Sequence, residues 1–304
     1  MANIRTLVLG ACALLAASLS ARAQDIEPRA YSNAPVGVNF AIVGLAGTRG
    51  GVAFDPTSDL KDPNLKTESL VFAYVRTLEL WGKSAKFDAI LPYAALDGTA
   101  TFRGGPVERH VDGLVDPRLR LSVNFFGAPA LGLKEFRNYR QDLIVGASLQ
   151  VGVPLGQYDA TRLVNLGNNR WLFKPELGAS QALGAWSLEG KLAANLYTDN
   201  KDFFGGQRRA QDNIYSLQGN VIYSFANGAW ASADVTWYEG GRTTLNGVRG
   251  NDLQQNWRVG ATLAWPVDAR NSIKLYASSG VSARTGNNYD GLGIAWQHRW
   301  GAGL

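Results

Sequence analysis

Hydrophobic and polar residues alternate with a period of two along most of the chain. In one clear segment, Leu119 and Leu121 occupy one parity while Arg118 and Arg120 occupy the other. An alternation of this kind predicts a β-strand with one apolar and one polar face. The segments that show it are twelve in number: 36–46, 68–81, 84–96, 117–126, 141–153, 170–181, 186–198, 214–225, 229–238, 255–265, 272–284 and 290–300.

The connections between these segments alternate in length. Short turns, such as residues 82–83, join some neighbours, whereas long polar stretches, such as 47–67 and 97–116, join the others. Short turns on one side and long loops on the other are typical of bacterial outer-membrane barrels. Two connections break this rule, because 127–140 is long and 285–288 is short. The pattern predicts an all-β, membrane-spanning, antiparallel up-and-down β-barrel of about 12 strands.

Composition agrees with a barrel in lipid. The chain has 35 glycines in 304 residues and 11% aromatic residues, but only 18% charged ones, against roughly 25% charged in an average soluble domain. An exported all-β sandwich or solenoid is the alternative, but it would have to hide these aromatics from water, and no fixed-period repeat supports a solenoid. Tryptophans gather at the ends of predicted strands, where a barrel carries aromatic girdles. The candidates for the membrane interface are Trp171, Trp186, Trp237, Trp257, Trp265, Trp296 and Trp300.

The first residues read as a secretory signal peptide. Arg5 precedes an apolar run at 7–21, and Ala21-Arg22-Ala23 matches a cleavage site. We therefore expect a signal peptide over 1–23 and a single barrel domain over 24–304. A lipoprotein signal at Cys12 is disfavoured, because the apolar run continues beyond it. Export without a second long apolar run leaves a soluble periplasmic protein, a secreted protein or an outer-membrane barrel. The strand and loop pattern favours the barrel, so we expect the bacterial outer membrane as the location.

Scarce residue types limit the chemistry. The chain has one Cys and two His, so disulfide, zinc and haem sites are disfavoured, and we expect no cofactor and no metal. Loss of the leader lowers the formal charge from +5 to +3, too little to argue for nucleic acid. The expected partners are outer-membrane lipids, lipopolysaccharide, the barrel assembly machinery and a small-molecule solute. Asp55, Asp59 and Asp62 could hold a cation, but a solvated loop is favoured.

Five short stretches resemble an outer-membrane family named after the meta-pathway of phenol degradation. They are APVG at 34–37, LPY at 91–93, DGLVDP at 112–117, IKLYASSGVSAR at 273–284 and WQHRW at 296–300. The resemblance spans most of the expected mature chain. It implies a barrel transporter for uptake or efflux of small, often hydrophobic or aromatic, compounds.

The predicted inward faces carry more basic than acidic residues. A moderately cationic, narrow lumen of this kind would favour anionic or polarisable solutes. Alternatively, the charges pair and fill the lumen, as Lys174 and Glu176 could on one strand face. Candidates for lining the lumen are Lys86, Asp88, Arg118, Arg120, Lys174, Glu176, Glu189, Lys191, Asp234, Arg258, Lys274, Arg284 and Arg299.

Three functions fit such a barrel. The sequence favours a channel or transporter for small, aromatic or anionic solutes. A structural or adhesive barrel without transport is one alternative, and an outer-membrane enzyme is a weaker one. No G-x-S-x-G motif occurs, and the two histidines have ordinary interpretations, His110 in an outside loop and His298 in a girdle. We therefore expect no enzyme and no catalytic residues.

Overall fold

The computed structural model describes residues 27–53, 60–102 and 104–304. The predicted signal peptide lies outside these ranges, as do the side chains of the acidic residues in the first loop. No helix in the described ranges is long and apolar enough to cross a membrane.

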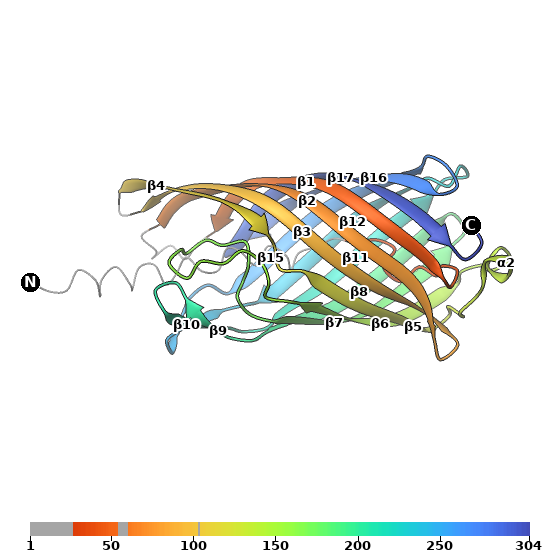
Figure 1. The fold of residues 1–304 in the computed structure, drawn as a ribbon, viewed down its shortest axis with the longest axis horizontal. Helices are drawn as coiled ribbons and strands as arrows, with labels where there is room; N and C mark the ends of the chain where they lie inside the picture. Colours follow the sequence, from red (N-terminus) through yellow and green to blue (C-terminus); the bar gives the residue numbers. More distant parts are fainter. Residues whose placement is uncertain (1–26, 54–59, 103) are drawn as a thin grey trace, which may run out of the picture.

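Within the described residues, twelve antiparallel strands form a closed barrel (Figure 1). The sheet closes because β2 pairs with β1 on one side and with β3 on the other. The barrel strands are β1 Val38–Ala53, β2 Leu60–Leu80, β3 Lys83–Phe102, β5 Arg118–Phe126, β6 Leu143–Gly152, β7 Leu172–Leu183, β8 Trp186–Tyr197, β11 Ile214–Ser224, β12 Trp230–Gly240, β15 Gln254–Pro266, β16 Asn271–Ala283 and β17 Gly286–Gly301. Every predicted strand corresponds to one of these, so the predicted fold class is confirmed.

The two faces of the sheet have the polarity that the period-two pattern predicts. On β7, Leu177 is 56% exposed whereas Glu176 is 8% exposed. Leu177 pairs in register with Leu192 of β8, which is also exposed. Exposed leucines around a buried polar interior reverse the arrangement of a water-soluble protein, in which charged residues are rarely buried. Such an outer surface is stable in lipid.

The predicted interface tryptophans lie near the two ends of the barrel wall. Trp237 and Trp257 are cross-strand partners with ring centroids 6.4 Å apart. One group lies toward the ends joined by long connections: Trp171, Trp237 and Trp257. The other lies toward the ends joined by short turns: Trp186, Trp265, Trp296 and Trp300.

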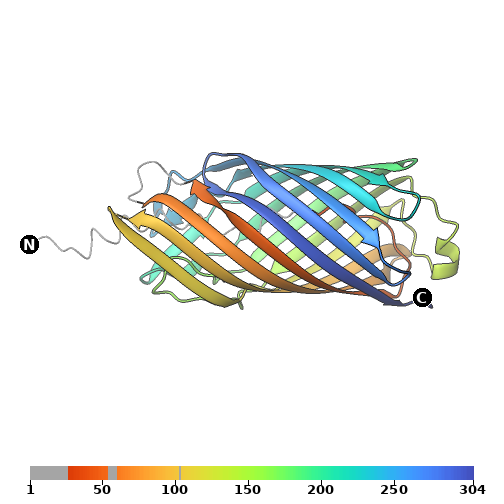
Figure 2. The same cartoon turned by 90° about the horizontal axis from the view of Figure 1, so that it is seen from above.

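The short turns, the C-terminus and the only described helical turn lie at one end of the barrel, here named the turn end (Figure 2). Gly82, Gly184 and Gly228 have positive φ in these turns, a conformation that glycine adopts without steric cost. The long 127–140 connection contains α2, Leu133–Phe136. A β-bridge between Lys83 and Pro129 attaches this connection to the barrel rim.

The opposite end, here named the loop end, differs from the prediction. The stretches 47–67 and 97–116, expected to be loops, are largely strands, because β1, β2 and β3 continue well past the tryptophans and β4, Gly105–Leu114, pairs with β3. These extensions lack a continuous apolar face, so the sequence pattern did not reveal them. A small second sheet comprises β9 Asn200–Phe203, β10 Gln207–Gln211, β13 Thr243–Leu245 and β14 Val248–Arg249.

The 153–171 connection packs against the barrel wall at the loop end. Its Leu166 joins an apolar cluster with Ala94 and Leu96, which have the inward parity of β3. Asp116 anchors the connection, because its carboxylate accepts hydrogen bonds from the backbone N–H groups of Gly156 and Asn168 at 3.0 and 2.9 Å. The connection therefore lies on the inner face of β3.

Candidate functional site

Charged and polar side chains line the barrel lumen. Among the predicted lining residues, the buried ones are Asp88, Glu176, Glu189, Lys191, Asp234 and Arg258. The half-buried ones are Lys86, Arg118, Arg120 and Lys174. Lys274 has inward parity, since its register partners Ala264 and Ala295 are buried. Arg284 and Arg299 are exposed and lie at opposite rims of the barrel.

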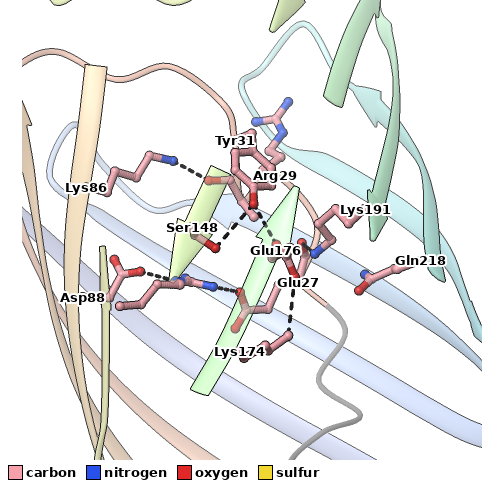
Figure 3. Close-up of polar contacts among 12 residues, drawn as sticks. Glu27, Arg29, Tyr31, Lys86, Asp88, Ser148, Lys174, Glu176, Lys191 and Gln218 are labelled. Atoms are coloured by element: carbon pink, nitrogen blue, oxygen red, sulfur yellow. Dashed lines mark hydrogen bonds and ion pairs between the residues drawn. The ribbon is translucent and has the colours of Figure 1, made fainter. Parts of the chain in front are cut away.

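The chain before β1 turns back into the lumen. We name residues 27–31 the N-terminal segment; Figure 3 shows it among the lumen side chains of several strands. Lys191 donates from Nζ to the Glu27 carbonyl oxygen at 2.7 Å, and Lys86 donates to the Ala30 carbonyl oxygen at 2.9 Å. Lumen lysines therefore hold the backbone of the segment from two sides of the barrel.

Glu27 extends an ion pair already present in the wall. Arg120 on β5 donates from Nε to Oδ2 of Asp88 on β3 at 2.5 Å, and its Nη1 contacts the carboxylate of Glu27. On β7, Lys174 lies 3.4 Å from Glu176, the same-face pairing considered from sequence. The guanidinium of Arg120 thus joins one acid of the wall to one acid of the N-terminal segment.

Tyr31 fits against two glycines. Gly146 and Gly178 are register partners on β6 and β7. A Cβ atom at these positions would lie 2.5 and 2.1 Å from Tyr31 ring atoms. The Tyr31 hydroxyl donates to Oε1 of Glu176 at 3.0 Å, and Asn124 donates to its carbonyl oxygen at 3.0 Å. Only glycine at both positions allows the ring to approach the sheet this closely.

Arg29 binds the turn end of the lumen. Its backbone N–H donates to Oε2 of Glu189 at 2.8 Å, and its guanidinium donates to Oγ of Ser224 at 2.5 Å. Its Cζ lies 4.9 Å from the ring centroid of Trp230, within the range of a cation–π interaction. Trp230, the first residue of β12, therefore contacts the N-terminal segment.

The wall formed by β11, β12, β15 and β16 carries its own polar contacts. Asp234 accepts hydrogen bonds from Asn220 and from Ser232, the latter at 3.1 Å. Arg258 donates to Ser278 at 2.9 Å, and its Cζ lies 3.9 Å from the Tyr289 ring centroid. These charged groups are held in place without the N-terminal segment.

Sequence reasoning did not find the N-terminal segment. Its contacts join positions far apart in the chain, such as Glu27 and Arg120, and the five residues have no period that predicts an element. The one available signal was the presence of two inward glycines, Gly146 and Gly178, since an inward glycine often marks close approach by another part of the chain.

A comparison with protein families shows which family the chain belongs to. Residues 48–297 match the sequence profile of a family described as the MetA-pathway of phenol degradation. The chain belongs to this family. The predicted resemblance is thereby confirmed. No curated protein sequence matches the chain.

Solved structures place this phenol-degradation family member among outer-membrane barrels by fold. The COG4313 outer membrane channel from Pseudomonas putida F1 is 19% identical, with a TM-score of 0.75 over 91% of this chain and 100% of that one. The β-domain of the Bordetella autotransporter BrkA is 13% identical, with a TM-score of 0.53 over 87% of this chain and 100% of that one. The shared feature is the closed antiparallel barrel, and the predicted outer-membrane barrel fold is confirmed.

The two histidines of this family member lie apart from the lumen charges. On β4, Nδ1 of His110 lies 2.5 Å from Oδ1 of Asp97, and this hydrogen bond raises the pKa of the imidazole. His298 stacks between Trp296 and Trp300, with ring centroids 5.8 and 5.9 Å away. In the described part of the chain, neither imidazole is hydrogen-bonded to a serine hydroxyl, which nucleophilic catalysis by a Ser–His pair requires.

Proposed function

We propose that this chain is an outer-membrane channel that passes small anionic solutes, aromatic ones among them, and that the N-terminal segment closes its passage. The observation that carries the proposal is the position of the Glu27 carboxylate. It binds Arg120 inside the lumen, where an anionic solute crossing the barrel would meet the same guanidinium. Glu27 thus occupies a site that suits the proposed solute.

The balance of charge in the lumen supports an anionic solute. Between the two rims, the predicted lining set contains seven basic and four acidic side chains. Withdrawal of the N-terminal segment would remove one carboxylate and two carbonyl acceptors from Arg120, Lys86 and Lys191. Unpaired cations along a narrow passage attract anions and repel cations.

The contacts of the N-terminal segment suit a reversible closure. Glu27, Arg29 and Tyr31 contact the wall through hydrogen bonds and ion pairs, which water or a solute can replace. The family description adds the aromatic class, because it connects the family to phenol degradation. An aromatic carboxylate combines the two properties.

Ion selectivity in a planar lipid bilayer tests this function. Across a KCl gradient, the reversal potential of the wild-type channel should report a preference for chloride. Replacing Arg120 and Lys191 with Gln should weaken that preference, because two lumen cations are removed. Arg208→Gln is the matched control, since Arg208 is exposed and pairs with Asp199 at the loop end.

Two results would contradict the proposal. A preference for potassium would exclude a passage governed by the lumen cations. Absence of any conductance, for the wild type and for a variant without the N-terminal segment, would favour a structural or adhesive barrel without transport.

A further inference from the structure

Two arginines are buried near the loop end, apart from the N-terminal segment. Arg170 ends the 153–171 connection and Arg209 lies in β10; they are 4% and 7% exposed. Alternation along β10 places Arg209 on the same buried face as Gln207 and Gln211. Among the described residues, no carboxylate forms an ion pair with either guanidinium. Buried arginines normally have such a partner.

Among the residues that the structure describes, several hydrogen-bonding atoms of this cluster have no partner. They are Nη1 of Arg170, Nε and Nη2 of Arg209, and the hydroxyl of Tyr197. Arg170 uses its Nη2 to donate to the side-chain oxygen of Gln211. Buried donors without an acceptor are unfavourable and uncommon in folded proteins. An acceptor from outside the described residues would satisfy them.

Aromatic rings cover the faces of both guanidiniums. The Arg170 Cζ lies 4.2 Å from the ring centroid of Tyr197, and the Arg209 Cζ lies 5.4 Å from that of Phe203. A ring bound through its π face leaves the N–H edge of a guanidinium available. The unpartnered guanidinium nitrogens named above belong to these edges.

The acidic residues of the surroundings have hydrogen-bond or ion-pair partners of their own. Asp252 accepts from the backbone and hydroxyl of Thr243 at 2.9 and 2.6 Å. Asp116 anchors the 153–171 connection, and Asp199 pairs with Arg208. Burial and the nearby charge of Arg170 lower the pKa of Arg209 to about 9. The nearby charge of Asp252 offsets only part of this effect.

We propose that Arg170 and Arg209, together with the Tyr197 hydroxyl, bind the carboxylate of a small solute at the loop end of the barrel. Carboxylate oxygens accept hydrogen bonds only, and guanidinium N–H groups are their strongest partners in proteins. The adjacent rings of Tyr197 and Phe203 would flank the bound anion. That a solute stops at this site on its way through the barrel rests on the proposed function. That the site binds a carboxylate does not.

Calorimetric titration of the full-length, folded barrel in detergent tests the site. Sodium benzoate is the probe, and benzyl alcohol is its neutral counterpart with the same ring. Benzoate should bind and benzyl alcohol should not. Arg170→Gln and Arg209→Gln should each weaken benzoate binding about tenfold or more, because each removes charged hydrogen bonds. Tyr197→Phe keeps the ring and should weaken binding to a smaller extent.

Arg208→Gln is the matched control, because Arg208 neighbours Arg209 on β10 but its side chain is 68% exposed; it should bind benzoate as the wild type does. A heat-dependent shift in gel mobility verifies that each variant is folded. If an arginine variant is not folded, Tyr197→Phe tests the site in its place. Three results would each overturn the site. They are equal affinity for benzoate and benzyl alcohol, an equal effect of Arg208→Gln and Arg209→Gln, and binding of inorganic phosphate but not of benzoate.

The same proteins separate this site from the proposed function. Benzoate binding without bilayer conductance would support the site and contradict the passage. Conductance without benzoate binding would support the passage and contradict the site.

Discussion

At the residue scale, a glycine pair determines how closely the N-terminal segment approaches the wall. Gly146 and Gly178 face the Tyr31 ring where any other residue would collide with it. The ring, its hydroxyl bond to Glu176 and the hydrogen bond from Asn124 together fix one end of the segment. Small changes at these positions should therefore alter the proposed closure of the lumen without altering the barrel strands.

Gly178→Ala should open the channel. The new Cβ would lie 2.1 Å from a Tyr31 ring atom, and overpacking of this kind costs about 1–3 kcal/mol. If the closed state alone carries that cost, the ratio of open to closed channels should rise about tenfold. Single-channel recording measures this ratio. Gly190→Ala is the control, since its Cβ would meet nothing within 4 Å, and an equal response of both variants would contradict the role of Tyr31.

His110 should titrate above its usual pKa of about 6.5. Its hydrogen bond to Asp97 and the charge of that carboxylate raise the pKa. The pair therefore stabilises the folded state fully below the pKa of the unfolded chain, and this stabilisation is lost as the pH rises through the pKa of the folded state. NMR titration of the imidazole measures the midpoint, which Asp97→Asn should lower. An unchanged midpoint in that variant would show that the pair does not form.

At the element scale, the strands serve two environments. Between the tryptophan groups, each strand has an apolar outer face and a polar inner face. Beyond the tryptophans, the extensions of β1 to β3 and all of β4 project past the wall at the loop end (Figure 1). One continuous strand can thus cross lipid and then continue into water, where an apolar face is no longer required.

A charge on the outer face should distinguish the two environments. Leu177→Arg on β7 should destabilise the barrel by about 2–4 kcal/mol if that face meets the middle of a bilayer. Val107→Arg is the matched control, because Val107 is exposed on β4, outside the proposed lipid region. Denaturant unfolding in lipid vesicles measures both. Equal destabilisation would contradict the assigned membrane region.

The sequence predicted elements wherever a periodic physical requirement acts on the chain. All twelve barrel strands were predictable, since lipid on one side and a polar lumen on the other force a period of two. β4 was not, because water contacts it and sets no such period. The contacts of Glu27 with Arg120, and the burial of Arg170 and Arg209, were also beyond prediction, since they join segments with no sequence signal for their proximity.

At the scale of the whole molecule, the barrel has an apolar outer face and a polar interior, the reverse of a water-soluble protein. The buried polar groups of that interior need hydrogen-bond or ion-pair partners. The wall supplies some of them, as in the pair of Arg120 with Asp88, and the N-terminal segment supplies others through Glu27, Arg29 and Tyr31. With the N-terminal segment inside, several of the lumen's charged groups have hydrogen-bond or ion-pair partners. Without the segment, the lumen would have an emptied arrangement with several cations unpaired, and we propose that solutes pass in the emptied one.

Conductance of the channel without residues 27–31 tests this account most directly. The purified variant and the wild type are compared in planar bilayers at the same salt concentration. The account predicts a larger, steadier and more anion-selective current for the variant, which an added peptide of sequence EPRAY should reduce. A current identical to that of the wild type, in size and selectivity, would contradict it.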